Sequence, residues 1–113
     1  MVSRLEVAST RRTLATNIEV ADSFPSRLRG LIGRRELGDG EALLFERARQ
    51  VHTLGMRFPI DVVFCDRRWR VVHVVPGMRP WRVSRWVRDA SVALELRAGA
   101  AGDLARGESL RAL

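Results

Sequence analysis

The stretch that decides the fold reads VHTLGMRFPIDVVFCD and runs from Val51 to Asp66. It turns at Gly55, and Pro59 disfavours helical geometry in the residue before it. The run from Ile60 to Cys65 follows, rich in β-branched residues and interrupted by one carboxylate, Asp61. A turn followed by such an apolar run predicts a β-strand.

A second strand is predicted immediately after the first. The run from Trp69 to Val75 is again apolar and β-branched, and Asp66-Arg67-Arg68 makes a tight connection, which predicts a β-hairpin. A two-residue turn puts His73 on the Phe64 face of the hairpin, away from Asp61. A three-residue turn puts His73 on the same face as Asp61. The sequence leaves both registers open.

Residues 52–64 resemble the signature of the DUF192 family, His-Thr-x-Gly-Met-Arg-x-x-x-(Ile/Leu)-Asp-(Val/Ile)-x-Phe. The matching residues are His52, Thr53, Gly55, Met56, Arg57, Ile60, Asp61, Val62 and Phe64. Residues 27–31 and 95–99 resemble two further family motifs, so the resemblance covers nearly the whole chain from about Ala15. Family members commonly carry glycine in the hairpin turn, where this chain has Trp69, which argues against a positive φ there. The resemblance implies a β-rich fold and no particular activity.

The rest of the chain predicts further short elements. Apolar residues at period two and β-branched runs place strands at residues 4–8, 13–21, 42–45, 51–54, 91–96 and 109–113. Short helices are predicted from residue 22 or 23 to 33 and from 100 to 106. Pro76-Gly77 and Pro80 open an irregular segment up to Arg88. We expect a single domain, residues 1–113, of the α+β class but mainly β, with a barrel-like or strongly curved antiparallel sheet and two short helices.

The composition is that of a globular domain. Hydrophobic residues make up 46% and charged residues 29% of the 113 residues. No apolar run approaches the roughly 20 residues that cross a bilayer, so we expect no membrane association. The first twenty residues contain no apolar signal-peptide core, which predicts a cytoplasmic location. Cys65 is the single cysteine, which excludes an internal disulfide, and no motif implies a cofactor.

Positive charge is concentrated in one part of the chain. The formal net charge is +7, and residues 67–88 hold seven arginines and no acidic residue. In the remaining sequence, thirteen arginines balance thirteen carboxylates. A local excess of this size favours an anionic partner.

The best candidate site is the segment RPWRVSRWVR, residues 79–88. Arginine binds phosphate, sulfate or carboxylate in bidentate fashion, and exposed indole faces stack on bases or sugars. We predict a noncatalytic binding module for a small anionic ligand, either a carbohydrate or a phosphate compound. The predicted ligand-binding residues are Met56, Arg57, Asp61, Arg79, Trp81, Arg82, Arg85 and Trp86. The competing interpretation is that the two tryptophans cover an open end of the core while the arginines are solvated.

Other interpretations stay open. The Asp61 carboxylate can instead accept hydrogen bonds from Arg57 or from amides of the 55–59 corner. The arginine-tryptophan segment can bind nucleic acid rather than a small ligand. A hydrolase-like enzyme centred on Asp61 with His52 or His73 is a third hypothesis, but no established catalytic motif is present, so we expect a binding protein. No metal site is expected, because the histidines and the cysteine lack paired ligand spacing.

Overall fold

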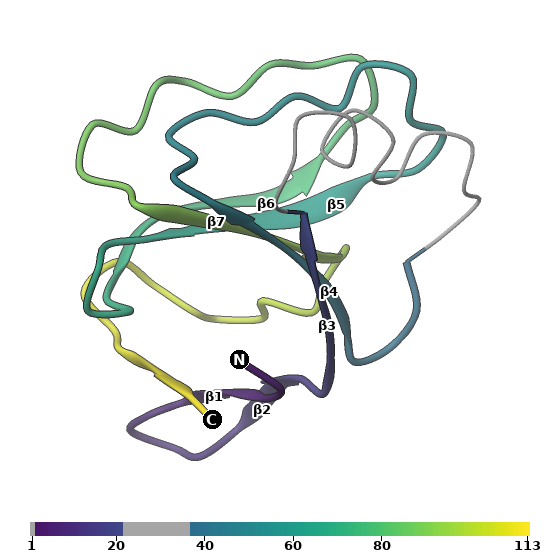
Figure 1. Cartoon of the computed structure of the whole chain (residues 1–113). Helices are drawn as coiled ribbons and strands as arrows, with labels where there is room; N and C mark the ends of the chain where they lie inside the picture. The colour runs from purple at the N-terminus through teal and green to yellow at the C-terminus, as the bar shows by residue number, and fades with distance from the viewer. Residues whose placement is uncertain (1, 22–36) are drawn as a thin grey trace.

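The computed structural model describes residues 2–21 and 37–113. Within them the chain forms eight β-strands and no helix (Figure 1). The strands are β1 (Leu5–Val7), β2 (Thr13–Ala15), β3 (Asn17–Ala21), β4 (Glu41–Glu46), β5 (Ile60–Cys65), β6 (Val71–Met78), β7 (Val92–Arg97) and β8 (Leu110–Ala112). The prediction of a mainly β fold is confirmed.

The strands form two open sheets rather than a closed barrel. The small sheet has the order β2-β1-β8, and the large sheet has the order β3-β4-β7-β5-β6. Neighbouring strands are antiparallel except for β3 and β4, which are parallel. The prediction of one barrel-like, antiparallel sheet is therefore corrected. One of the two core clusters is enclosed because the two sheets pack against each other, not because one sheet closes on itself.

Residues 13–21, predicted as one strand, serve both sheets. The chain leaves the small sheet after β2 and joins the large sheet with β3, changing direction at Thr16. The amides of Thr16 and Asn17 both donate to the carbonyl of Gly40, at 2.9 and 3.0 Å. Gly40 has a φ of 76°, and a Cβ there would lie 2.9 Å from the Thr16 hydroxyl oxygen. This corner therefore requires glycine.

Apolar side chains fill both faces of the large sheet, and β5 is buried at all six positions. On one face, Val63 and Cys65 pack in a cluster that includes Leu5 of the small sheet. On the other face, Val62 and Phe64 belong to a second cluster. A strand covered on both faces is a nearly continuous apolar run, which is why the sequence identifies it. Burial of each such large side chain contributes roughly 1.5–3 kcal/mol.

The helix predicted at residues 100–106 is a series of turns instead. Gly102 has a φ of 59°, which interrupts helical geometry in the middle of the segment. The Arg12 guanidinium donates to the Ala101 carbonyl at 2.8 Å and holds the turns against the small sheet. The helix predicted to end at residue 33, with the family motif inside it, lies outside the described residues.

The β5–β6 hairpin combines a three-residue loop with a bulge, which neither predicted register contains. The Asp66 amide donates to the Arg70 carbonyl at 2.9 Å, which sets the length of the loop. The register then shifts by one residue, so that His73 pairs with Phe64. Their rings stack with centroids 6.0 Å apart. His73 therefore lies on the Phe64 face, away from Asp61.

Trp69 has a φ of 63°, so the expectation of a negative φ in this turn is wrong. Its amide donates to the Asp66 carbonyl at 3.1 Å. One Asp66 carboxylate oxygen also accepts hydrogen bonds from the amides of Arg68 and Arg70, at 2.9 and 3.0 Å. These bonds offset the roughly 1–2 kcal/mol that a left-handed conformation costs a residue other than glycine.

Candidate functional site

Residues 79–88, called the strap below, lie along residues 49–53. Backbone hydrogen bonds of 2.7–2.9 Å join the two segments, a contact called the seam below. Their donors are the amides of Thr53, Trp81, Ser84 and Val87. The β-bridge of the seam joins His52 to Val83, so the strand predicted at 51–54 is reduced to a single bridge. The seam fixes the backbone that carries most of the predicted site residues.

Two buried hydroxyl groups hold the strap in place. The Thr53 hydroxyl donates to the Arg79 carbonyl at 2.6 Å and accepts from the Arg82 amide at 3.0 Å. The Ser84 hydroxyl accepts from the Val51 amide at 3.0 Å. Backbone polar groups of the strap are thus satisfied on its inner side, and its long side chains face outward.

The tryptophans of the strap do not cover the core. Trp81 is 64% exposed and Trp86 is 60% exposed. Val87 and Ala90, which follow Trp86 in the chain, are instead buried in the core. The arginines of the strap, Arg79, Arg82, Arg85 and Arg88, are all exposed. The interpretation of the indoles as core cover is therefore wrong, and the strap presents both indole and guanidinium groups to solvent.

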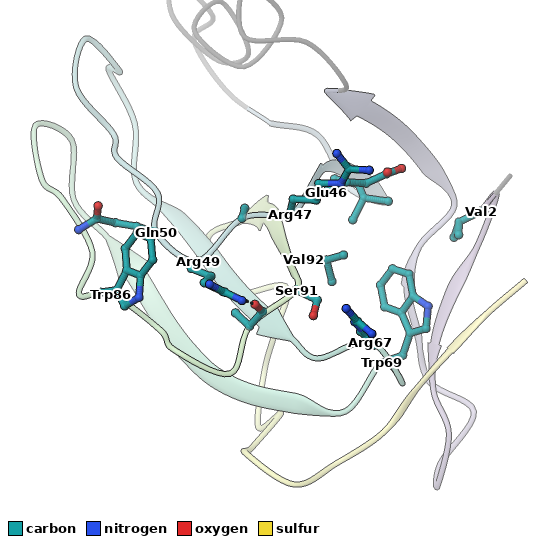
Figure 2. Close-up of a pocket in the computed structure, with 13 residues that line it drawn as sticks. Val2, Glu46, Arg47, Arg49, Gln50, Arg67, Trp69, Trp86, Ser91 and Val92 are labelled. Atoms are coloured by element: carbon teal, nitrogen blue, oxygen red, sulfur yellow. Dashed lines mark hydrogen bonds between the residues drawn. The ribbon is translucent and has the colours of Figure 1, made fainter.

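A groove of about 830 Å³ lies beside the strap (Figure 2). Figure 2 shows Trp86 and Gln50 at one end of the groove, Arg67 and Trp69 at the other, and Arg49 between them. The arginines and tryptophans that line it are Arg47, Arg49, Arg67, Trp69 and Trp86. They come from three parts of the chain: the loop after β4, the β5–β6 turn and the end of the strap.

The groove is predominantly positive. Its described lining holds three arginines and one carboxylate, Glu46. Neither Arg47 nor Arg67 forms an ion pair with a carboxylate of the described residues. The Nε of Arg49 donates to the Ala90 carbonyl at 3.3 Å, which anchors that side chain at the middle of the groove. The arginines therefore retain donors for an anion.

A second, smaller hollow of about 390 Å³ lies between β6 and the strap. His73 lines it from β6, and Arg79, Arg82 and Arg85 line it from the strap. The pKa of His73 is lowered from its ordinary value, first by burial and then by Arg85 and Arg106. The imidazole is consequently uncharged at neutral pH, and the arginines supply the positive charge of this hollow.

Asp61 is buried inside the fold. One carboxylate oxygen accepts from the Gly77 amide at 2.8 Å, and the other accepts from the amides of Gly99 and Ala101, at 3.0 and 2.9 Å. The carboxylate thus has the structural contacts expected of it, although its donors are not the predicted ones. Gly77 reaches Asp61 with a φ of 57°, and β6 continues through the predicted break to Met78.

The described residues do not assemble a catalytic group around Asp61. His73 lies on the other face of the sheet, and His52 is exposed, its Nδ1 accepting a hydrogen bond from a backbone amide at 3.2 Å. Cys65 is buried, and burial, followed by the charge of Asp66, raises its pKa to about 12. The described part of the chain also contains no group of three or more acidic, histidine or cysteine side chains placed to hold a metal ion.

The predicted ligand-binding residues occupy several places rather than one pocket. The small hollow is lined by Arg79, Arg82 and Arg85, and the groove is lined by Trp86. Met56 and Asp61 are buried, whereas Arg57 and Trp81 are exposed and line neither hollow.

The sequence does not predict most of the arginines and tryptophans that line the groove. Arg67 belongs to the basic stretch, but Arg47, Arg49 and Trp69 carry no separate signal there. These residues line one groove only because the β5–β6 turn and the loop after β4 lie close together in the folded chain.

The burial of Glu95 is also not predicted from the sequence. Glu95 is buried on β7, opposite Val62 of β5 and Leu43 of β4. Burial raises its pKa to about 8. The available signal is a carboxylate inside the apolar run VALEL, residues 92–96.

Two packed, open sheets with a groove beside an arginine-rich strap define a small, mainly β domain. The chain belongs to the DUF192 family, described as an uncharacterized ACR, which matches residues 5–112. The resemblance seen in the sequence is therefore confirmed. No curated protein matches the chain.

Two solved structures are similar to this fold. One, a protein of unknown function from Novosphingobium aromaticivorans, has a TM-score of 0.80 at 22% identity, covering 96% of this chain and 81% of that one. The other, described as a putative transcription regulator from Sinorhizobium meliloti, has a TM-score of 0.77 at 25% identity, covering 96% of this chain and 90% of that one.

Proposed function

We propose that this protein is a noncatalytic binding module for a small anionic ligand, with a phosphorylated sugar as the model compound. The observation that carries the proposal is the meeting of three arginines and two tryptophans around one groove of about 830 Å³. Small-molecule sites typically occupy about 300–1,000 Å³. We propose binding rather than catalysis because the described lining contains no histidine or cysteine that could serve as a base or nucleophile.

The chemistry of the groove suits a ligand with a charged group and a flat apolar face. Arg47 and Arg67 offer planar guanidinium groups for bidentate contact with a phosphate. Trp69 and Trp86, from opposite ends, offer indole faces for a sugar ring. Arg47 and Trp69 also have left-handed backbones, with φ of 57° and 63°. Arg11 and Trp81, which do not line the groove, have the same conformation, so the proposal rests on the side chains of the groove and not on its backbone.

Single-stranded nucleic acid is the competing ligand. The Sinorhizobium meliloti protein, 25% identical to this chain, is described as a putative transcription regulator. The strap offers four exposed arginines and two exposed indoles, a combination suited to a phosphate backbone and stacked bases. A small ligand would depend on Arg67, whereas a polymer would depend on Trp81, which lies outside the groove. Variants at these two positions separate the alternatives.

Calorimetry with hexose monophosphates, and with the same hexoses lacking phosphate, tests the proposal. We expect only the phosphorylated sugars to bind. Arg67→Ala should weaken binding about tenfold, which corresponds to about 1.4 kcal/mol and is typical for the loss of a charge-assisted hydrogen bond. Arg111→Ala on β8 is the matched control, because Arg111 is also an exposed arginine but does not line the groove.

Two results would contradict the proposal. Equal affinity of the Arg67→Ala and Arg111→Ala variants would show that the groove is not the site. Binding of single-stranded DNA that loses about 1–3 kcal/mol with Trp81→Ala, and nothing with Arg67→Ala, would replace the small ligand by nucleic acid.

A further inference from the structure

Exposed large apolar side chains are gathered at one place on the surface. Among the described residues, the exposed large hydrophobic side chains are Leu54 (41%), Trp81 (64%), Val83 (56%), Trp86 (60%) and Leu113 (46%). All except Leu113 belong to the strap or to the segment that the strap pairs with. Scattered single exposures are ordinary, but a contiguous group of this kind marks an interaction surface.

Backbone pairing explains why these side chains are neighbours. The antiparallel bridge between His52 and Val83, together with the hydrogen bond from the Trp81 amide to the Thr53 carbonyl at 2.9 Å, holds the backbone of residues 81–83 beside that of residues 52–53. Side chains alternate along an extended segment, and Thr53 is fully buried. His52 and Leu54, on either side of Thr53, are both exposed.

We call Leu54, Trp81 and Val83 the apolar rim. Trp86 is left out of the rim because it lines the groove, whereas none of the three rim residues does. The rim is thus independent of the groove proposed above to hold a small ligand.

The two segments that supply the rim carry positive charge only. Residues 47–60 and 67–88, which supply the rim and its neighbours, contain no acidic residue. Arg57 lies near one end of the rim in sequence, and Arg79, Arg82 and Arg85 flank its strap side; all four are exposed. An apolar projection surrounded by guanidinium groups complements a surface that is both apolar and anionic.

We propose that the apolar rim docks this protein onto the surface of an anionic lipid bilayer. Indole rings partition into the interfacial region, where one end of the ring is apolar and the other is wet. Leu54 and Val83 would enter the acyl boundary beside the indole, while the arginines bind lipid phosphates. Docking of this kind is peripheral and needs no spanning segment, so it departs from the sequence-based expectation of no membrane association. No helix of the described residues is long and apolar enough to cross a bilayer.

The aliphatic members of the rim decide between a bilayer and a nucleic acid. Leucine and valine have neither a π-face for a base nor a donor for a phosphate, so Leu54 and Val83 add nothing to nucleic-acid binding. They do contribute at a lipid interface, because apolar area is removed from water there. A bilayer therefore accounts for the whole rim, whereas a polyanion accounts only for Trp81 and the arginines.

Sedimentation with lipid vesicles tests this inference. We expect binding to vesicles containing roughly a third phosphatidylglycerol, with negligible binding to pure phosphatidylcholine, because each arginine near an anionic surface contributes about fivefold in affinity. Leu54→Ser and Val83→Ser should each weaken vesicle binding at least fivefold. Leu113→Ser is the matched control, since Leu113 is exposed to a similar extent at the other end of the chain, and it should bind like the wild type.

Tryptophan fluorescence reports the depth of the contact. Brominated lipids should quench the wild-type protein, and Trp81→Phe should abolish most of this quenching while circular dichroism shows an unchanged fold. Hexose monophosphates should not displace the protein from vesicles, which separates the rim from the groove.

The inference fails if anionic vesicles do not bind the protein at low salt. It also fails if Leu54→Ser and Leu113→Ser bind vesicles equally, since the contact is then electrostatic alone. If single-stranded DNA binds far more tightly than vesicles and depends on Trp81 but not on Leu54, the surface belongs to a nucleic acid.

Discussion

Asp61 and Glu95 are buried carboxyl groups on neighbouring strands of one sheet, and their surroundings are opposite. Asp61 pairs with Leu96, and Glu95 pairs with Val62, so the two side chains leave the sheet on opposite faces. Asp61 accepts three backbone hydrogen bonds. The described chain provides no hydrogen-bond donor for the Glu95 side chain, whose pKa is raised to about 8 by burial alone.

The comparison teaches that burial does not decide what a carboxyl group does in this fold. At Asp61 the carboxylate oxygens connect Gly77 of β6 with the turns that follow β7, so these hydrogen bonds are part of the architecture. At Glu95 an ionised side chain would be unfavourable, because the described residues on that apolar face donate no hydrogen bond to it. Asp61 stabilises the fold through three backbone hydrogen bonds, whereas Glu95 stabilises it when protonated.

The largest effect should come from the pH dependence of Glu95. Its pKa rises from 4.5 to about 8 on folding, so between these values the folded chain holds a proton that the unfolded chain has lost. Stability contributed by the protonated group is fully present below pH 4.5 and is lost as the pH rises to about 8. The slope is about 1.4 kcal/mol per pH unit, or roughly 4 kcal/mol over the window. Urea denaturation across this range measures it.

Glu95→Gln removes the titrating group and keeps the shape of the side chain. The variant should therefore unfold with a much flatter pH profile than the wild type and be the more stable of the two at pH 8. Parallel profiles for the two proteins would show that Glu95 is solvated in the folded state.

Asp61→Ala should have the next largest effect. The substitution leaves the amides of Gly77, Gly99 and Ala101 without their acceptor, at a cost of about 3 kcal/mol in the free energy of unfolding. The exposed Asp89 provides a control, because Asp89→Ala removes a carboxylate without removing a described hydrogen bond. An unchanged urea midpoint for Asp61→Ala would refute the structural role.

Thr53→Val should lower the free energy of unfolding by less, about 1–2 kcal/mol, because it removes a hydroxyl group instead of a carboxyl group. The Thr53 hydroxyl holds the Arg79 carbonyl and the Arg82 amide, so the loss should be confined to the strap. Hydrogen exchange should show faster opening of the strap amides with little change in β5. Thr53→Ser keeps the hydroxyl and should restore slow exchange; uniform loss of protection over the whole chain would contradict this localisation.

The smallest effect is expected when the folded protein is treated with a thiol reagent. Its target, Cys65, is a third buried titratable group and lies on the Asp61 face of β5. Its raised pKa, about 12, keeps the thiol protonated at neutral pH, and its burial excludes reagents. A disulfide reagent should therefore leave the folded protein unmodified at pH 7.5 and react fully in urea. Fast stoichiometric reaction without denaturant would show that this face opens.

The sequence predicts the parts of this fold whose causes are local. The β5–β6 hairpin is identifiable because a β-branched run buried on both faces leaves a continuous apolar signature. The register of the hairpin cannot be predicted from the sequence, because the one-residue bulge that places His73 beside Phe64 depends on hydrogen bonds. The left-handed turn at Trp69 is equally hidden, since it depends on the Asp66 side chain and not on glycine.

The candidate site follows the same division. The basic strap is evident from composition, and the outward position of its arginines agrees with the ordinary behaviour of charged side chains. The exposure of Trp81 and Trp86 contradicts the usual tendency of large aromatic residues to fill a core. The groove depends on tertiary structure and is not predicted from the sequence, because Arg47 and Trp69 line it together only when the loop after β4 lies near the hairpin turn.

The small sheet joins the two ends of the chain. Leu5 of β1 lies opposite Ala112 of β8, and Figure 1 shows the termini close together beside this sheet. On the ribosome, β1 is made about a hundred residues before β8, so the small sheet can be completed only after residues 110–112 have emerged. A circular permutant that links the two ends and opens an exposed turn elsewhere would convert this distant pairing into a local hairpin, with a smaller entropy cost of closure.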